Sequence, residues 1–168
     1  MTGRRRGPPS AARGAALRTA AAATALTLGV VPAVFADPSY PQGNSSFQIN
    51  CAMCHGSAGA GVPAVAPPLS AYPARYAASA EGRRQLAMTL LYGLFGDIAV
   101  DDKHYDARMP DFARLDDATL AATLNFVVFD LGHAPASVKP LEAAEIAAER
   151  GKPNDAAAVR EHRKSLAP

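Results

Sequence analysis

The sequence has only two cysteines and almost no pattern typical of β-strands. Cys51 and Cys54 lie three residues apart. Such a pair can serve as a redox-active dithiol in thioredoxin-like proteins, but that fold needs strands alternating with helices around it. A structural zinc site requires a second pair of ligands, and the sequence offers no further cysteine. The shortage of strands and cysteines therefore argues against both uses of this pair.

The sequence also lacks a hydrophobic run long enough to cross a membrane comfortably. Its longest apolar stretch, residues 20–31, follows five arginines and no acidic residue, and Pro32 ends it. Small residues then precede Ala36, as a signal peptidase requires. We expect residues 1–36 to be a secretory signal peptide, cleaved after Ala36, that directs the chain to the periplasm. The alternative is a retained membrane anchor.

A strong excess of charge of either sign is absent too. The chain carries 17 Lys and Arg against 15 Asp and Glu, and without residues 1–36 its net charge changes from +2 to −3. Nucleic-acid-binding domains carry a clear basic excess, so we expect no nucleic-acid partner. The residues after Ala36 suffice for one small core, to which a large apolar cofactor would add buried surface.

Helical periodicity dominates the residues after Ala36. Within residues 82–95, four leucines share one helical face: Leu86, Leu90, Leu91 and Leu94. Another helix should begin at Asp116 or Asp117 and repeats apolar residues at helical spacing: Leu120, Leu124, Val127 and Val128. Residues 44–51 fit a short third helix. The pattern predicts an all-α fold.

Two regions depart from this helical pattern. Residues 98–100 and 103–105 predict two short strands, joined by Asp101 and Asp102 as a tight hairpin turn. Four prolines predict an extended loop after the cysteines: Pro63, Pro67, Pro68 and Pro73.

The tail, residues 139–168, is rich in alanine and of mixed charge. It predicts one short helix within residues 141–149 and a second that starts at residues 153–155. We expect this C-terminal extension to be helical or partly disordered, and solvated or loosely docked. The alternative is a docking segment for a partner.

The two cysteines belong to the motif Cys51-Ala52-Met53-Cys54-His55, the attachment signature of c-type haem. On a helix, residues at positions i, i+3 and i+4 share one face. Both sulfurs can therefore reach the two vinyl groups of one porphyrin while His55 faces the iron. The motif predicts one covalently attached haem c per chain, with His55 as an axial ligand.

The second axial position needs another residue. Met109 lies in a loop before the last predicted helix, and Pro110 keeps it out of helical geometry. Met53 lies inside the attachment turn, and Met88 is expected to pack in the core. A thioether opposite histidine raises the reduction potential, as suits an electron carrier. We predict Met109 as the sixth ligand, with His104 as its rival.

On these residues the chain resembles the class I c-type cytochromes, small monohaem electron-transfer proteins, over residues 43–131. The resemblance rests on several short features: Gly43 and Phe47, the haem motif with Gly56, Pro67-Pro68-Leu69, and Met109-Pro110. It implies the cytochrome c fold in residues 37–138, with three to five helices around one covalently bound haem. A short β-hairpin should precede the methionine loop.

The resemblance also implies roles for residues around the haem. The carbonyl of Pro67 should accept a hydrogen bond from His55 Nδ1, and Leu69 should pack on the haem. Family members commonly use a tryptophan to bind a haem propionate, but this sequence has none. Four residues stay open for that role: Tyr72, Arg75, Tyr76 and Tyr105.

The implied function is that of a monomeric periplasmic electron carrier and not an enzyme. A six-coordinate His/Met haem would pass one electron from a dehydrogenase or other respiratory donor to an oxidase or reductase. Residues 93–98 and the hairpin resemble a bacterial branch that serves quinoprotein dehydrogenases or is fused to copper nitrite reductases. The expected partners are therefore a quinoprotein dehydrogenase, a nitrite reductase or a terminal oxidase. The alternative is a haem enzyme or gas-binding sensor with an open distal site.

An acidic segment surrounds Met109. Residues 97–117 contain seven aspartates against three basic residues, a net charge of −4. Clustered charge of one sign steers encounter with an oppositely charged surface. The segment predicts a redox partner with a basic docking patch.

Overall fold

The structure, a computed structural model, describes residues 1–3, 7 and 39–166. The expected signal peptide and its cleavage site therefore lie almost wholly outside the described residues. Residues 39–166 belong to one compact unit. In this part of the chain, no helix is both long and apolar enough to cross a membrane.

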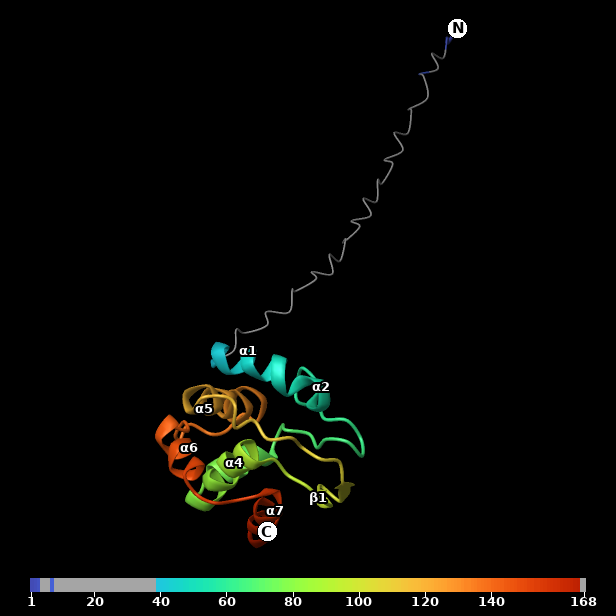
Figure 1. Ribbon diagram of the computed structural model, residues 1–168. Helices are drawn as coiled ribbons and strands as arrows, with labels where there is room; N and C mark the ends of the chain where they lie inside the picture. The colour runs from blue at the N-terminus through green and yellow to red at the C-terminus, as the bar shows by residue number, and fades with distance from the viewer. Residues whose placement is uncertain (4–6, 8–38, 167–168) are drawn as a thin grey trace. The chain divides into compact units, whose positions relative to one another are not determined.

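The compact unit is helical, with one two-stranded sheet (Figure 1). In chain order its elements are α1 (Pro41–Asn50), α2 (Ala52–His55), α3 (Tyr72–Ala77), α4 (Ala80–Tyr92), β1 (Ile98–Val100), β2 (Lys103–Tyr105), α5 (Asp117–Asn125), a π-helical continuation η1 (Phe126–Leu131), α6 (Ala143–Arg150) and α7 (Ala156–Ser165). Helices α1 to α5 fall within residues 37–138, in agreement with the three to five expected there. Two further helices form the tail.

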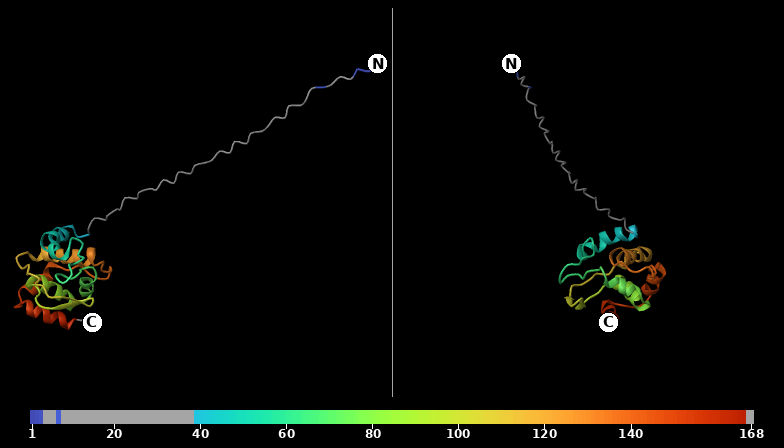
Figure 2. Two further views of the ribbon diagram at one scale, coloured as in Figure 1. Left: turned by 90° about the vertical axis from the view of Figure 1, so that its right-hand side faces the viewer. Right: turned by 180° about the vertical axis from the view of Figure 1, so that it is seen from behind.

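Helix α1 lies directly against α5 (Figures 1 and 2). A Cβ atom at Gly43 would stand only 2.0 Å from the carbonyl oxygen of Ala122, so this close approach requires glycine. Next to it, the fully buried Phe47 packs on Phe126 with ring centroids 5.3 Å apart. Because these contacts join the first and last helices of residues 37–138, they close the fold around the residues between them.

Helix α4 is the central helix and contacts α3, α5, α6 and α7. Its N-terminus is capped by Ser79, whose hydroxyl accepts a hydrogen bond from the Gly82 amide (3.1 Å). Leu86, Leu90 and Leu91 of the predicted leucine face are buried and Leu94 is partly buried, but the helix ends at Tyr92 and not near residue 95. Gly93 follows the helix, and its φ is 72°, a conformation that is unfavourable for residues other than glycine.

The predicted hairpin is present with the predicted strand bounds. Strands β1 and β2 pair antiparallel with Val100 opposite Lys103, so Asp101 and Asp102 form a two-residue turn. Both aspartates have positive φ, 47° and 59°. Tight hairpin turns require this geometry, and aspartate tolerates it better than most residues.

The region after the haem motif was expected to be a loop as far as Pro73, and this is wrong from Tyr72 onward. Residues 72–77 form helix α3, and Pro73 occupies its first turn. A proline is tolerated there because the first amide groups of a helix have no intrahelical acceptor.

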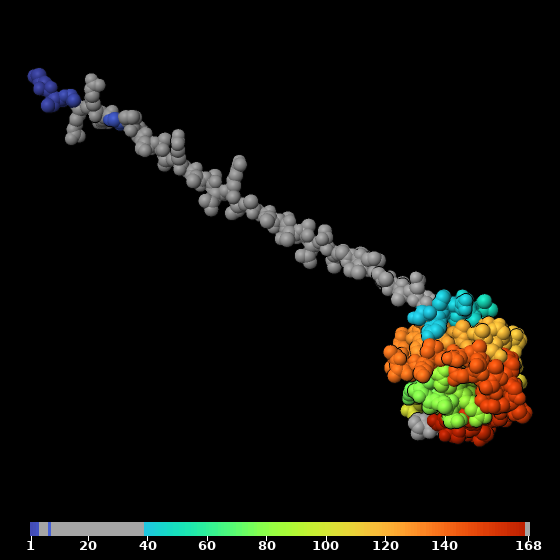
Figure 3. Space-filling model, turned by 90° about the vertical axis from the view of Figure 1, so that its left-hand side faces the viewer, coloured from blue at the N-terminus to red at the C-terminus, as the bar shows by residue number. Residues whose placement is uncertain are grey.

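The tail is not loosely docked, contrary to expectation. Ile146 of α6 and Val159 of α7 are both fully buried. The tail begins at a buried amide pair: Asn125 Nδ2 donates to the Leu141 carbonyl (3.0 Å), and the Leu141 amide donates to Asn125 Oδ1 (2.7 Å). On the face shown in Figure 3, the tail lies beside helix α4 and is part of the same surface.

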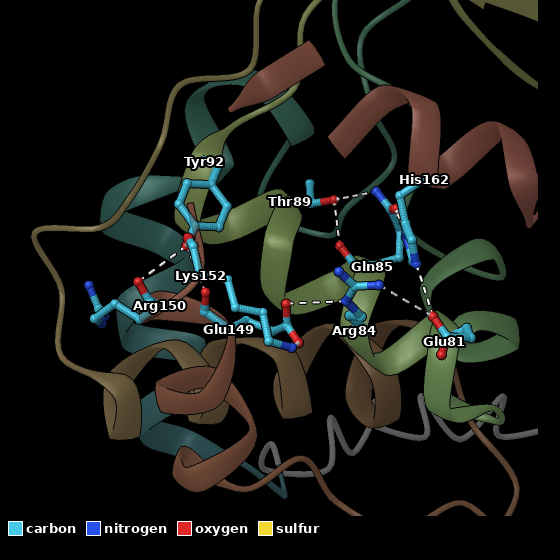
Figure 4. Close-up of polar contacts among 9 residues, drawn as sticks. All are labelled: Glu81, Arg84, Gln85, Thr89, Tyr92, Glu149, Arg150, Lys152 and His162. Atoms are coloured by element: carbon cyan, nitrogen blue, oxygen red, sulfur yellow. Dashed lines mark hydrogen bonds and ion pairs between the residues drawn. The ribbon is translucent and has the colours of Figure 1, made fainter. Parts of the chain in front are cut away.

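Polar contacts reinforce this attachment along one side of α4 (Figure 4). The hydroxyl of Tyr92 donates to the carbonyl of Glu149 (2.7 Å), whose side chain pairs with Arg84 at 3.2 Å. Further along α4, His162 of α7 bonds to Gln85 Oε1 at 2.7 Å. Single-sequence periodicity could not reveal these contacts because each joins residues more than 50 positions apart.

Candidate functional site

The haem motif begins at the end of α1 and continues through the single turn α2. The amide of Cys51 donates to the Phe47 carbonyl (2.8 Å), and the amide of His55 donates to the Cys51 carbonyl (3.0 Å). These bonds place Cys51, Cys54 and His55 on one helical turn. No disulfide joins the two cysteines, and burial raises the pKa of the Cys51 thiol to about 11. A catalytic dithiol needs a lowered thiol pKa, so the burial of Cys51 argues against a role in disulfide exchange.

His55 has one ring nitrogen bonded and the other free of protein hydrogen bonds. Its side chain is buried, and Nδ1 lies 3.0 Å from the carbonyl oxygen of Pro67. Because a carbonyl oxygen can only accept, Nδ1 carries the proton and Nε2 carries the lone pair. Burial lowers the pKa of His55, so the ring is neutral. A neutral imidazole with a fixed tautomer is ready to bind a metal through Nε2.

Backbone bonds in the loop after α2 bring Pro67 to this ring. The amide of Gly61 donates to the His55 carbonyl (2.8 Å), and the amide of Leu69 donates to the Gly59 carbonyl (2.8 Å). A Cβ atom on Gly61 would approach the Ala66 carbonyl oxygen to 2.6 Å, so the loop can close only over glycine here. The loop thereby fixes both the Pro67 carbonyl and the Leu69 side chain relative to α2.

His55, both cysteines and Leu69 line one cavity whose walls come from most elements of residues 41–128 and from α7. The cavity is open to solvent, and its empty space together with the solvent space at its mouth measures about 1370 Å³. The walls are mainly apolar and include Phe47, Leu86, Leu90 and Val127. Two thiols, one imidazole and apolar walls fit a covalently attached haem.

Met109 lines the same cavity. Its backbone exchanges two hydrogen bonds with Leu94, of 3.1 and 2.9 Å, which join the methionine loop to the chain just after α4. This contact requires glycine at position 93, because a Cβ there would stand 2.5 Å from the Met109 carbonyl oxygen. Sequence reasoning singled out the methionine but not the glycine that holds its loop.

The rival ligands lie elsewhere. Met88 is buried in α4 and does not line the cavity, and Met53 is 90% exposed at its rim. His104 is exposed outside the cavity, and its Nδ1 lies 2.9 Å from Asp97 Oδ2. Among the described residues, Met109 is therefore the methionine that combines cavity exposure with a loop position.

Of the four residues considered for binding a haem propionate, three line the cavity and one does not. Tyr72, Tyr76 and Tyr105 line the cavity, whereas Arg75 does not and lies 3.8 Å from Asp101. Sequence reasoning missed a fifth residue, Arg163 of α7, which also lines the cavity. No local pattern could have indicated Arg163, because it reaches the site only through the docking of the tail.

Zinc has no support in the described part of the chain, where no cluster of three or more His, Cys, Asp or Glu side chains could hold a metal ion.

Comparison with known proteins identifies the family. The sequence matches the family described as cytochrome c over residues 41–128. It is 38% identical over 118 residues to a cytochrome c-552 of Thermus thermophilus, an alignment that covers 69% of this chain and 90% of the relative. A second cytochrome c-552 from the same species is also 38% identical over 118 residues, with 80% of its length covered. The chain therefore belongs to the cytochrome c family as a class I c-type cytochrome that carries covalently attached haem c.

Proposed function

We propose that the protein is a periplasmic one-electron carrier whose haem iron is held by His55 and Met109. The observation that carries this proposal is that the free imidazole nitrogen of His55 and the side chain of Met109 belong to one apolar cavity. An electron-transfer role is what membership of the cytochrome c family supports. The site residues Cys51, Cys54, Pro67 and Leu69 complete the proposal.

Each side chain has a distinct task in this proposal. Cys51 and Cys54 form the two thioether links that anchor the haem. Pro67 holds the proton of His55 on Nδ1, which keeps Nε2 available and strengthens the imidazole as a ligand. Bound haem supplies a centre that accepts and releases one electron. The apolar wall, which includes Leu69, excludes water, and together with a methionine ligand it raises the reduction potential.

The competing function is a haem enzyme or gas-binding sensor with an open distal site. A haem enzyme needs polar acid–base groups near the vacant iron position. The cavity walls are mainly apolar, and the polar groups in them other than His55 are few: Asn50, Tyr72, Tyr76, Thr89, Tyr105, Arg108, Thr123 and Arg163. Of these, only the two arginines carry charge, and both are cations unsuited to act as general bases. The composition of the wall therefore favours the carrier.

Absorption spectra of the holoprotein test this choice. We expect the ferric protein to show the weak far-red band that methionine ligation gives in this family. The ferrous protein should fail to bind carbon monoxide on mixing, because Met109 already occupies the sixth position. Absence of the band together with rapid carbon monoxide binding would identify an open site and overturn the proposal.

Periplasmic location and partner class are part of the same proposal. Cleavage after Ala36 would release a monomer beginning at Asp37. N-terminal sequencing of protein from a periplasmic fraction tests this directly, and a chain that still begins before residue 20 would indicate a retained anchor. Reconstitution with purified quinoprotein dehydrogenase, nitrite reductase and terminal oxidase tests the donor and acceptor.

A further inference from the structure

A buried arginine without an anionic partner lies in the wall of the haem cavity. Arg163, in the last turns of α7, is 8% exposed. Every other arginine of α3 to α7 that is not exposed either pairs with a carboxylate or lies outside the cavity wall. No carboxylate of the described residues lies within 4.0 Å of the Arg163 guanidinium. Burying a charge without a partner is costly, so this position calls for an explanation.

Protein contacts use only part of the hydrogen-bonding capacity of Arg163. Nη1 donates to the hydroxyl of Tyr76 (2.9 Å), and Nη2 donates to the carbonyl of Ala99 in β1 (3.2 Å). A guanidinium has five N–H donors, so three remain without an acceptor among the described residues. The group also stacks over the ring of Tyr72, with Cζ 4.2 Å from the ring centroid. None of these neighbours supplies negative charge.

The tyrosine pair has a spare donor as well. The hydroxyls of Tyr72 and Tyr76 lie 2.7 Å apart, and one of them donates to the other. Because Arg163 can only donate to Tyr76, one of the two hydroxyl protons remains without an acceptor among the described residues. Both tyrosines line the haem cavity with Arg163. The three side chains thus present a cation and an unused O–H donor to the space that the haem fills.

We propose that Arg163, Tyr72 and Tyr76 form the binding site for a haem propionate. A propionate carboxylate is the anionic part of the cofactor, and it accepts hydrogen bonds from guanidinium and hydroxyl donors. It supplies both missing partners at once: the counter-ion of the buried cation and the acceptor for the hydroxyl proton. The lowering of the Arg163 pKa to about 10 by burial fits a cation that lacks its counter-ion in the protein alone.

Other basic residues are weaker candidates. Arg75 is 62% exposed at its side chain and pairs with Asp101. Arg108 lines the cavity but is exposed, and solvent screens its charge. Of the two arginines in the wall, only Arg163 is buried. The C-terminal helix therefore takes part in cofactor binding, which gives the tight docking of the tail a function.

The test is a redox titration against pH on haem-loaded protein. Variant Arg163→Gln removes the cation, Arg163→Lys keeps the charge, and Lys164→Gln removes a neighbouring charge that is 58% exposed and pairs with Glu161. In Arg163→Gln we expect the pH at which the potential responds to propionate protonation to rise by about one to three units. Arg163→Lys should restore most of the wild-type profile, and Lys164→Gln should leave it unchanged.

A purely structural arginine would give a different result. If Arg163 only stacks on Tyr72, Arg163→Gln should have a lower thermal midpoint of unfolding. The pH at which its potential responds to propionate protonation should then equal that of Lys164→Gln. That outcome would overturn the proposal. A measurement on the wild-type ferrous protein does not depend on the variants folding. Nuclear Overhauser contacts between the Arg163 side chain and the propionate methylenes are expected, and their absence with both signals assigned would also refute it.

Discussion

At the residue scale, His55 is prepared for metal binding by groups that a sequence motif does not contain. The motif supplies the imidazole, but the Pro67 carbonyl, 3.0 Å from Nδ1, selects the tautomer, and burial keeps the ring neutral. The carbonyl reaches the ring through a loop that closes over Gly61. The motif and the loop therefore act as one unit, although His55 and Pro67 are twelve positions apart in the sequence.

Replacing Met109 by alanine should leave the haem attached but remove the sixth ligand. We expect the reduction potential to fall by more than about 0.1 V, a fraction of the range of about 0.8 V over which axial ligands tune haem. Ferrous protein should then bind carbon monoxide readily. Potentiometry and absorption spectra measure both effects.

Met88→Ala is the matched control, because Met88 is equally a methionine but lies in the core outside the cavity. It should lose about 2–5 kcal/mol of stability and keep the wild-type spectrum. An unchanged spectrum and potential in Met109→Ala would show that another group, with His104 the first to examine, is the ligand.

Gly93→Ala should disturb the methionine loop without touching the haem. Gly93 has φ 72° and ψ −172°, a region that only glycine enters readily. An added Cβ would also stand 2.5 Å from the Met109 carbonyl oxygen. We expect a loss of about 1–3 kcal/mol in unfolding free energy and a weaker far-red band. Denaturant melts and ferric spectra provide the measurements.

The control is Gly151→Ala, at a glycine with φ −73° and open space around its Cβ position. It should be neutral or stabilising by up to about 1 kcal/mol. Equal effects of the two substitutions would mean that the Gly93 conformation is not needed to hold Met109.

At the scale of elements, the sequence predicted best what local chemistry determines. The hairpin follows from Asp101 and Asp102 between two short strand-forming segments, and Asp116 caps α5 by accepting from the Thr119 amide (2.7 Å). Helix α3 was missed because prolines dominated the local pattern, although Pro73 sits where a helix accepts it. The docking of α6 and α7 could not be predicted, because it depends on contacts with α4 that are distant in sequence.

The attachment of α6 should depend on pH through Glu145. Arg83 binds both of its carboxylate oxygens, at 2.7 and 2.5 Å, and this contact lowers the pKa of Glu145. A carboxylate with a depressed pKa contributes stability above its ordinary pKa of about 4.3, and the contribution is lost as the pH falls below that value. The Glu145 side chain is 38% exposed, so solvent screening limits the effect to about 1 kcal/mol.

We therefore expect Glu145→Gln to destabilise the holoprotein at pH 7 but much less at pH 3. Urea unfolding at the two pH values measures the difference. Asp106→Asn is the control, because Asp106 is an exposed carboxylate with no ion pair among the described residues. If both variants show the same pH dependence, the Arg83 contact contributes nothing to the attachment of the tail.

At the scale of the whole molecule, the core is built around the cofactor. Phe47, Leu86, Leu90 and Val127 are buried by their protein neighbours and also border the haem cavity. Without haem these side chains would face an empty apolar space, which is costly for the folded state. Helices of about ten residues are also marginal by themselves. The apo chain should therefore be largely unfolded.

The double variant Cys51→Ala plus Cys54→Ala tests this. We expect colourless protein with weak helical circular dichroism and no cooperative thermal transition. The haem-loaded wild type, measured under the same conditions, is the reference. A cooperatively melting apo protein would show that the tail helices and the crossing of α1 with α5 stabilise the fold alone.

The acidic segment around Met109 is partly neutralised in the folded protein. Asp101 lies 3.8 Å from Arg75, and Asp117 bonds to Arg150, both of them cations from outside the segment. The net charge of −4 in residues 97–117 thus overstates the field that a partner meets. Four exposed aspartates of this segment have no ion pair among the described residues: Asp102, Asp106, Asp111 and Asp116. Any electrostatic steering must come mainly from these.

The rate of electron transfer to a partner with a basic docking patch should therefore fall as salt is raised. Screening shortens the Debye length from about 30 Å at 0.01 M to about 3 Å at 1 M, and steering contributes about tenfold or more to such rates. Asp102→Lys plus Asp106→Lys should slow the low-salt reaction and abolish its salt dependence. The control for the single variant Asp106→Lys is Glu161→Lys, a charge reversal on α7. This control should have little effect on the electron-transfer rate. A rate that rises with salt, or ignores both salt and substitutions, would instead favour docking through exposed apolar side chains, of which Met53 and Val65 lie at the cavity.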